Sequence, residues 1–132
     1  MLSKVHHVGI AVRDLDAAIE FYSGTFGVEF TYRHTATDQG VEEAMGKVGE
    51  SWIQLLRPVS PESPVGKFID KRGEGVHHVA YAVADVEQAL RELEGLGITL
   101  IDEHPRIGSM DASIAFLHPK SVGGVLTELV QE

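Results

Sequence analysis

An internal repeat constrains the fold of this chain more than any other feature of its sequence. Residues 5–14 (Val-His-His-Val-Gly-Ile-Ala-Val-Arg-Asp) and residues 76–85 (Val-His-His-Val-Ala-Tyr-Ala-Val-Ala-Asp) agree at seven of ten positions, 71 residues apart. In each copy a helical pattern follows and ends at a glycine, Gly27 or Gly97, which is the expected residue just past a helix. Because these features recur at one offset, the sequence predicts two copies of one structural unit.

The two predicted helices, residues 15–26 and 86–96, also begin alike. Asp14 and Asp85 are well placed to cap the helix N-termini, since an aspartate side chain accepts a hydrogen bond from a backbone N–H of the first turn. Gln88 follows Asp85 by three residues and predicts a capping box.

The remainder of each copy is predicted to be strands. The expected strands are residues 29–37, 42–48 and 52–56 in the first copy, and 99–103, 112–117 and 125–130 in the second. Between the copies lies a proline-containing linker with a short helical run near residues 66–71. The sequence thus predicts one α+β domain, residues 1–132, made of module one (4–57), a linker (58–75) and module two (76–131). Each module is expected to run strand, helix, strand, strand, strand.

Composition excludes several classes of function. The chain has no cysteine, so disulfides, thiolate metal sites and a cysteine nucleophile are excluded, and an intracellular, cytoplasmic location is expected. The formal net charge of −9 argues against nucleic-acid binding, which needs clustered Lys and Arg. No apolar run approaches the roughly 18 residues of a membrane span, and no leader or membrane association is expected.

Strand alternation distinguishes the two histidines of each repeated pair. His6 and His77 share a strand face with bulky apolar residues, which are expected to pack beneath the helices. His7 and His78 share the opposite face with glycine and alanine. Small side chains leave room on that face, so His7 and His78 are the candidate ligands.

Two polar residues in the closing strands complete a candidate metal site. Gln54 and Glu128 each lie in the middle of an apolar strand, in corresponding segments of the two copies. A buried carboxylate or amide is costly unless it is paired or bound to a metal. A lone strand histidine is more often structural than a ligand, but here duplicated positions all carry ligand-type residues. The sequence therefore predicts a divalent-metal site formed by His7, Gln54, His78 and Glu128.

Other polar residues leave alternatives open. Glu42 and Glu43 are adjacent on a predicted strand and must point to opposite faces, so one of them can face the cleft. Lys120 is a candidate for binding an anionic group of a ligand, although a single lysine is more often simply solvated. The remaining histidines, at positions 34, 104 and 118, lack a duplicated context and are interpreted as structural or surface residues.

The paired modules resemble the vicinal oxygen chelate superfamily, and within it the methylmalonyl-CoA epimerase family, over nearly the whole chain. The matching stretches are residues 6–12, 63–69, 72–78 and 116–129. The first is common across the superfamily, whereas the last two are much more specific to the epimerases. The resemblance implies a cupped, half-open mixed sheet around one divalent ion per chain, and a homodimer.

The function that the resemblance implies is interconversion of the 2R and 2S forms of methylmalonyl-CoA through an enolate. The implied metal ligands are again His7, Gln54, His78 and Glu128. Glu43 is implied as one base and Glu128 as the other, although a metal-bound carboxylate is a weak base and another group can supply the second proton. Lys120 and Arg106 are candidates for contacts with the CoA phosphates. The donor set suits cobalt, manganese, magnesium, nickel or zinc and does not choose among them.

Three rival functions share the same fold. One is a glyoxalase-type metal-dependent isomerase or lyase acting on glutathione adducts, against which Gln54 and the Glu43 segment argue. Another is a metal-free small-molecule-binding protein, against which the intact ligand set argues. An extradiol dioxygenase is less favoured, because it needs a redox-active iron and usually a longer chain.

Overall fold

The computed structural model describes residues 1–132 and contains eight β-strands and three α-helices. The strands are β1 (Lys4–Ala11), β2 (Phe30–Ala36), β3 (Val41–Val48), β4 (Ser51–Pro58), β5 (Gly75–Ala82), β6 (Arg106–Ile107), β7 (Ser113–Leu117) and β8 (Thr127–Gln131). The helices are α1 (Leu15–Phe26), α2 (Pro64–Arg72) and α3 (Val86–Gly95), with short 3-10 turns at Thr37–Gln39, Ser109–Asp111 and Pro119–Ser121. The predicted α+β class, with two βαβββ modules and mixed strand pairing, is confirmed. None of the helices has the length and apolar content that crossing a membrane requires.

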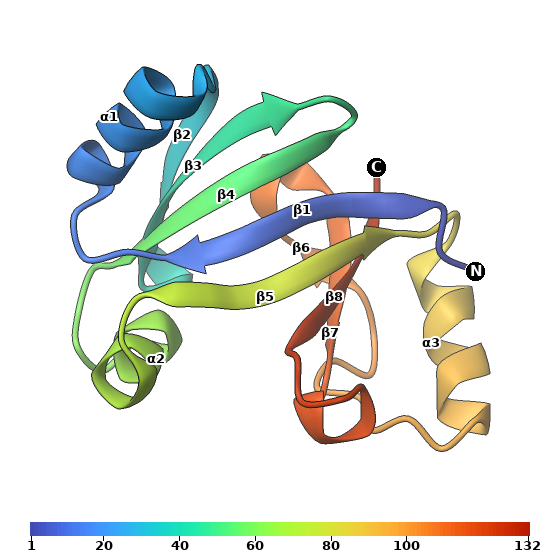
Figure 1. Ribbon diagram of the computed structural model, residues 1–132. Helices are drawn as coiled ribbons and strands as arrows, with labels where there is room; N and C mark the ends of the chain where they lie inside the picture. Colours follow the sequence, from blue (N-terminus) through green and yellow to red (C-terminus); the bar gives the residue numbers. More distant parts are fainter. The chain divides into compact units, whose positions relative to one another are not determined.

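Residues 7–77 form one compact unit, whose strands are arranged in the order β2-β3-β4-β1 (Figure 1). β1 runs parallel to β4, and the other pairs are antiparallel. Helix α1 packs on one face of these strands, where Leu15 contacts a cluster that includes Val12, Ala44 and Leu55. Ile10 packs against the same cluster, so the bulky face of β1 lies beneath the helix, as the alternation predicted.

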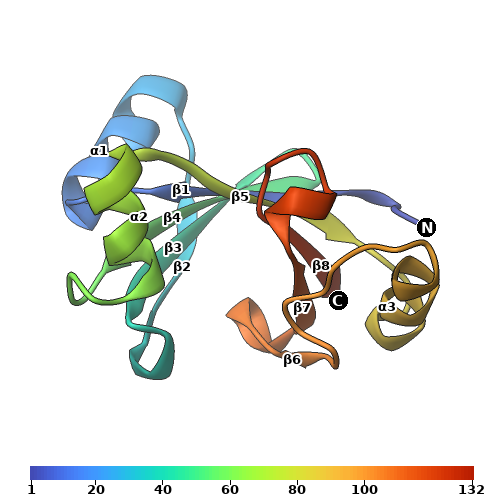
Figure 2. The ribbon, with the colours of Figure 1, turned by 90° about the horizontal axis from the view of Figure 1, so that it is seen from below.

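Helix α2 packs on the opposite face of the strands of the same unit. Figure 2 shows this unit from below, with α2 drawn over part of α1. Val65 and Ile69 of α2 form a buried cluster with Ala11, Val41 and Leu56 of the strands. Strand alternation places Ala11 on the face of His7, and Leu56 on the face of Gln54. The small-residue face predicted to be open is therefore covered at one end by α2.

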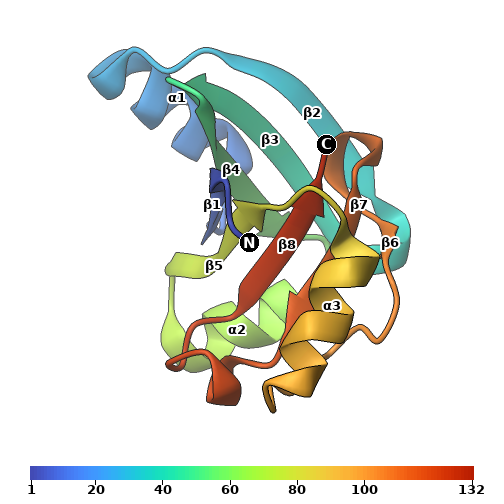
Figure 3. The same ribbon diagram turned by 90° about the vertical axis from the view of Figure 1, so that its right-hand side faces the viewer.

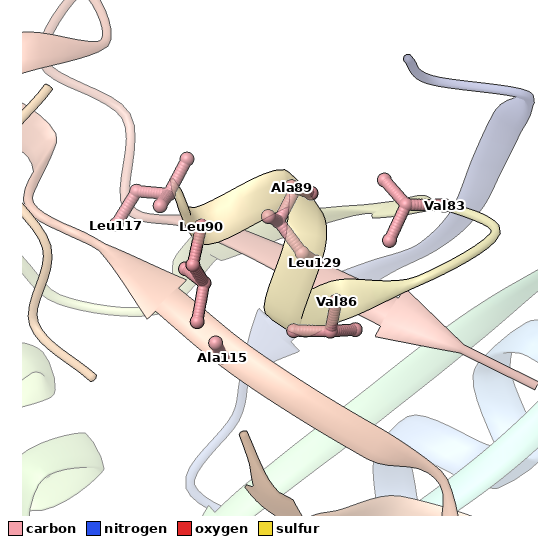
Figure 4. Packing of buried hydrophobic residues seen from close by; sticks show 7 residues of the cluster. All are labelled: Val83, Val86, Ala89, Leu90, Ala115, Leu117 and Leu129. Atoms are coloured by element: carbon pink, nitrogen blue, oxygen red, sulfur yellow. The ribbon is translucent and has the colours of Figure 1, made fainter. Parts of the chain in front are cut away.

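Residues 1–6 and 78–132 form the second compact unit, with the strand order β5-β8-β7-β6. Helix α3 lies alongside β7 and β8 (Figure 3). Its residues Val86, Ala89 and Leu90 recur at the i, i+3, i+4 spacing of one helix face and pack on the strands. Figure 4 shows this cluster, in which Leu90 lies beside Ala115 and Leu117.

The predicted start of both helices and the predicted end of α1 agree with the structure, whereas α3 ends at Gly95, one residue earlier than predicted. Asp14 Oδ1 accepts from the Ala17 N–H at 3.0 Å, and Asp85 Oδ1 accepts from the Gln88 N–H at 3.0 Å. Helix α1 ends at Gly27, whose φ of 69° lies in the left-handed region that glycine favours. The Gln88 side chain donates to Glu92 rather than back to the helix start, so the reciprocal half of the predicted capping box is not formed.

The strand predicted at residues 99–103 is wrong. In its place there is one isolated bridge, between Leu100 and Leu117, and the strand beside β7 is the two-residue β6. The N–H groups of Ile101 and Asp102 both donate to the Phe116 carbonyl, at 3.0 and 3.2 Å, which breaks the alternation of a regular ladder. The Asp102 side chain accepts from the Phe116 N–H at 2.8 Å, so a carboxylate oxygen occupies the place of a backbone acceptor.

Candidate metal centre and active site

His78 and Glu128 are brought together by the parallel pairing of β5 with β8. The register pairs Ala80 with Glu128, and His78 lies on the same strand face as Ala80. His78 Nε2 is 3.1 Å from Glu128 Oε1, and both side chains are buried. Removing a carboxylate from water is costly without a partner, so this contact is the local reason that Glu128 is tolerated inside an apolar strand.

Gln54 and Glu43 form a second buried polar pair, on the neighbouring strands β4 and β3. Both residues are 3% exposed, and Gln54 Nε2 donates a hydrogen bond of 2.9 Å to Glu43 Oε1. This bond fixes which way the amide points, because only its nitrogen can donate. The amide oxygen, Gln54 Oε1, is buried and accepts no hydrogen bond, so oxygen is the atom that Gln54 offers to a cation.

His7, on β1, belongs to a cluster of three potential metal-binding residues. His7, His78 and Glu128 are all buried, and one ligand atom from each lies within 4.8 Å of the others. Two imidazole nitrogens and a carboxylate suit a divalent first-row ion, and an amide oxygen such as that of Gln54 is compatible with the same ions. These donors therefore fit a divalent metal.

The other histidine of each repeated pair has a different environment. His6 Nε2 lies 3.1 Å from Glu132 Oε1, and Lys4 Nζ lies 3.2 Å from the same oxygen. The ring of His77 packs edge-on against Phe68, with centroids 5.0 Å apart. The distinction between the two histidines of each pair thus follows strand alternation, as the sequence indicated.

The adjacent carboxylates Glu42 and Glu43 point to opposite faces of β3. Glu42 accepts hydrogen bonds from Arg33 Nε at 3.0 Å and from Arg57 Nε at 3.2 Å. The hydrogen bond from Arg33 is the main cause that lowers the pKa of the Glu42 carboxyl, and it also raises the pKa of Arg33. Glu42 therefore belongs to a surface charge network, and Glu43 is the carboxylate available to the site.

The two basic residues expected to bind substrate lie in different surroundings. Arg106, on β6, donates from Nε to Asp102 Oδ1 at 3.2 Å and covers the ring of Phe116, with Cζ 5.5 Å from the ring centroid. Lys120 lies in the Pro119–Ser121 turn and is exposed. Its backbone N–H donates to His118 Nδ1 at 3.1 Å, so the structure gives His118 the local structural role expected of it.

Sequence reasoning missed Phe116, which lies against the candidate metal ligands. Its ring is 5.6 Å from that of His78, at an interplanar angle of 78°, and β7–β8 pairing sets it opposite Glu128. Strand alternation could have placed Phe116 on the face of Ile114, but no sequence pattern indicates a contact with His78, which is 38 residues away.

The two copies differ in whether this face carries a second buried acid beside the candidate ligand. In the first copy Gln54 pairs with Met45, and Glu43 pairs with Leu56. In the second copy Glu128 pairs with Phe116, and Ile114 pairs with Val130. Leu56 and Val130 each follow the candidate ligand by two residues, so Ile114 is the counterpart of Glu43. The buried acid thus has no carboxylate equivalent in the second copy.

Comparison with known proteins gives a consistent family assignment. Residues 6–116 match the model of the Glyoxalase/Bleomycin resistance protein/Dioxygenase superfamily. The chain is 35% identical to an ethylmalonyl-CoA/methylmalonyl-CoA epimerase of Cereibacter sphaeroides, over 99% of each protein. It is 34% identical to the human mitochondrial methylmalonyl-CoA epimerase, over 98% of this chain and 74% of that protein.

The fold is also that of solved epimerase structures. A methylmalonyl-CoA epimerase in complex with methylmalonyl-CoA and NH4+ superimposes with a TM-score of 0.96 at 45% sequence identity. The alignment covers 100% of this chain and 96% of that one.

Proposed function

Because the chain belongs to the Glyoxalase/Bleomycin resistance protein/Dioxygenase superfamily, we propose that it interconverts the 2R and 2S forms of methylmalonyl-CoA. The comparisons support an epimerase, an enzyme of the isomerase class. The observation that carries the proposed mechanism is the hydrogen bond between Gln54 and Glu43, which joins a buried acid to a candidate metal ligand.

The proposed metal ligands are His7, Gln54, His78 and Glu128. The mutual approach of ligand atoms from His7, His78 and Glu128 supports this set, as does the orientation of the Gln54 amide. A divalent ion held there supplies a Lewis acid that stabilises negative charge on the thioester and carboxylate oxygens of the substrate. The donor types suit cobalt, manganese, magnesium, nickel or zinc.

Glu43 is the proposed base for one face of the substrate. Its carboxylate takes the proton from C2, and the electron pair of the C–H bond delocalises into the adjacent thioester and carboxylate groups. Burial supports this role, because a carboxylate shielded from water transfers a proton to and from substrate without competing solvent. The Gln54 amide holds one Glu43 oxygen and so orients the carboxylate.

Glu128 is the proposed acid and base for the other face. It would return a proton to C2 from the side opposite Glu43, which inverts the centre, and the two residues would exchange roles in the reverse direction. Metal coordination lowers the basicity of a carboxylate. The role of Glu128 as a base therefore has to be tested separately from that of Glu43, with a variant at position 128.

Lys120 and Arg106 are proposed to bind anionic groups of the substrate. Exposure of Lys120 supports the first assignment, and the 42% exposure of the Arg106 side chain supports the second. We also propose a homodimer in the cytoplasm, as the family resemblance implies. Light scattering coupled to gel filtration would measure the mass in solution and contradict the dimer if it gave that of one chain.

The reaction can be tested with one C2 epimer of methylmalonyl-CoA in deuterated water. The wild-type protein should convert the sample to a mixture of the two C2 epimers, which changes its optical rotation, and place deuterium at C2, and a chelator should suppress both changes. Turnover of a glutathione hemithioacetal without activity on methylmalonyl-CoA would contradict the proposal and favour a glyoxalase-type isomerase.

Glu43→Gln is the decisive variant, and Glu42→Gln is its matched control on the adjacent residue. Loss of a general base typically costs about 10²–10⁴-fold, and that loss is expected in kcat for Glu43→Gln alone. Glu42→Gln should retain epimerase activity, because Glu42 points away from Glu43. Undiminished C2 exchange from both C2 epimers in Glu43→Gln would remove Glu43 from the mechanism.

A further inference from the structure

We infer that Phe116, held by Asp102 and Arg106, positions the imidazole of His78 for metal binding. The inference rests on the proposed metal site and extends it to three residues that do not themselves bind the ion. All the contacts that support it lie within residues 78–132.

The contact between Phe116 and His78 is the first support. The two rings are 5.6 Å apart at 78°, an edge-to-face arrangement that aromatic rings favour. His78 is also held by Glu128, at 3.1 Å, and Glu128 is the register partner of Phe116 across β7 and β8. The imidazole is therefore contacted by two side chains from neighbouring strands, which limits its rotation.

Phe116 is itself held from a second direction. The Arg106 guanidinium covers its ring, with Cζ 5.5 Å from the centroid, which is a cation–π distance. Arg106 Nε donates to Asp102 Oδ1 at 3.2 Å. The other oxygen, Asp102 Oδ2, accepts from the Phe116 backbone N–H at 2.8 Å. One carboxylate thus fixes both the backbone of Phe116 and the cation over its ring.

An apolar core alone does not require this arrangement. The neighbouring position on the same face of β7 is Ile114, which packs in an apolar cluster with Ala80 and Val130. A leucine at position 116 would fill much of the space, but it offers neither a face to Arg106 nor a ring edge to an imidazole. Residues that orient a metal-bound histidine commonly change metal affinity by about 10–100-fold when they are replaced.

The test measures Co²⁺ binding to the substrate-free protein, by competition with a chelator and by the visible spectrum of the bound ion. Phe116→Leu should weaken Co²⁺ binding by about tenfold and alter the spectrum, whereas Phe116→Tyr, which keeps the ring, should restore both. Ile114→Val is the matched control, because it trims the same strand face away from His78, and it should leave affinity and spectrum unchanged.

Arg106→Gln is the second variant, since the side chain is partly exposed and its replacement leaves the core intact. It should weaken Co²⁺ binding by about two- to threefold, less than Phe116→Leu, because the ring remains but loses its cation. If Phe116→Leu and Arg106→Gln both bind Co²⁺ like the wild type, the positioning role is wrong while the metal site stands. If the wild-type protein binds no Co²⁺, the metal site and this inference fail together.

Discussion

Gln54 donates a hydrogen bond of 2.9 Å from its amide nitrogen to Glu43, and both side chains are 3% exposed. Since the amide nitrogen donates to Glu43, the amide oxygen is the atom through which Gln54 would bind the proposed metal ion. A single side chain therefore connects the proposed base to the proposed metal site, and its replacement should affect both.

Gln54→Ala should weaken divalent-metal binding by about 10–100-fold and lower kcat/KM for epimerisation, because it removes an oxygen donor and the group that orients Glu43. Calorimetric titration with Co²⁺ measures the first effect, and steady-state kinetics at saturating metal measure the second. Met45→Leu, a similar-sized replacement at the register partner of Gln54, is the control. Wild-type affinity in Gln54→Ala would show that the amide is not a ligand.

Removal of metal should lower the melting temperature of the wild-type protein, because an ion that binds only the folded state stabilises it. His78→Ala should remove this metal-dependent shift, while His6→Ala should keep it, since His6 lies on the other strand face and contacts Glu132. Thermal denaturation with added Co²⁺ or with chelator makes the measurement. An equal shift in His78→Ala and the wild type would argue against His78 as a ligand.

Glu42 should contribute to stability at neutral pH but not in acid. Its pKa is lowered in the folded state, chiefly by the hydrogen bond from Arg33, so its contribution is present above the unfolded-state pKa of about 4.5 and is lost as the pH falls through the lower, folded-state value. Glu42→Gln should cost about 0.2–1 kcal/mol at pH 7, as expected of a largely surface network. Urea denaturation at pH 7 and pH 3 should show this difference shrinking in acid; a constant difference would contradict it.

Two helical glycines should respond in opposite ways to replacement by alanine. A Cβ at Gly66 of α2 would lie 2.5 Å from the Ser60 carbonyl oxygen and 2.7 Å from that of Pro61, so Gly66→Ala should be destabilising by about 1–3 kcal/mol. A Cβ at Gly24 of α1 would meet nothing within 4 Å, so Gly24→Ala should stabilise the protein by about 0.5–1 kcal/mol. Urea denaturation of the two variants checks the sign of each change, and a shared sign would refute the comparison.

Much of this fold could be predicted, because the repeated motif and the strand period can each be recognised within a short stretch of sequence. Alternation separates His7 from His6 and His78 from His77 without knowledge of any neighbour. The helix caps at Asp14 and Asp85 likewise depend on residues within one turn. The module bounds at residues 4–57 and 76–131 remain a prediction.

The misses involve contacts between residues that are far apart in sequence. The strand expected at residues 99–103 does not form, because the Asp102 carboxylate accepts the hydrogen bond from the Phe116 N–H. No pattern within residues 99–103 predicts that hydrogen bond. Aspartate is depleted in strands, and Pro105 has no backbone N–H to donate to a neighbouring strand. Asp102 and Pro105 were therefore the sequence signals against a strand in this segment. Strand alternation alone left open which of Glu42 and Glu43 faces the site, because the hydrogen bonds from Arg33 and Arg57 to Glu42 join separate strands.

Glu43 and Ile114 occupy equivalent positions in the two copies but differ in chemistry, so the two halves of the chain do not offer the same groups to a substrate. Two identical halves would present the same groups to both sides of a substrate. Here the histidines remain duplicated, while the acid is present in one half and replaced by a hydrocarbon in the other. In the proposed mechanism the two proton transfers use carboxylates in different surroundings, Glu43 hydrogen-bonded to Gln54 and Glu128 beside His78, and the forward and reverse reactions are expected to show different primary isotope effects at C2.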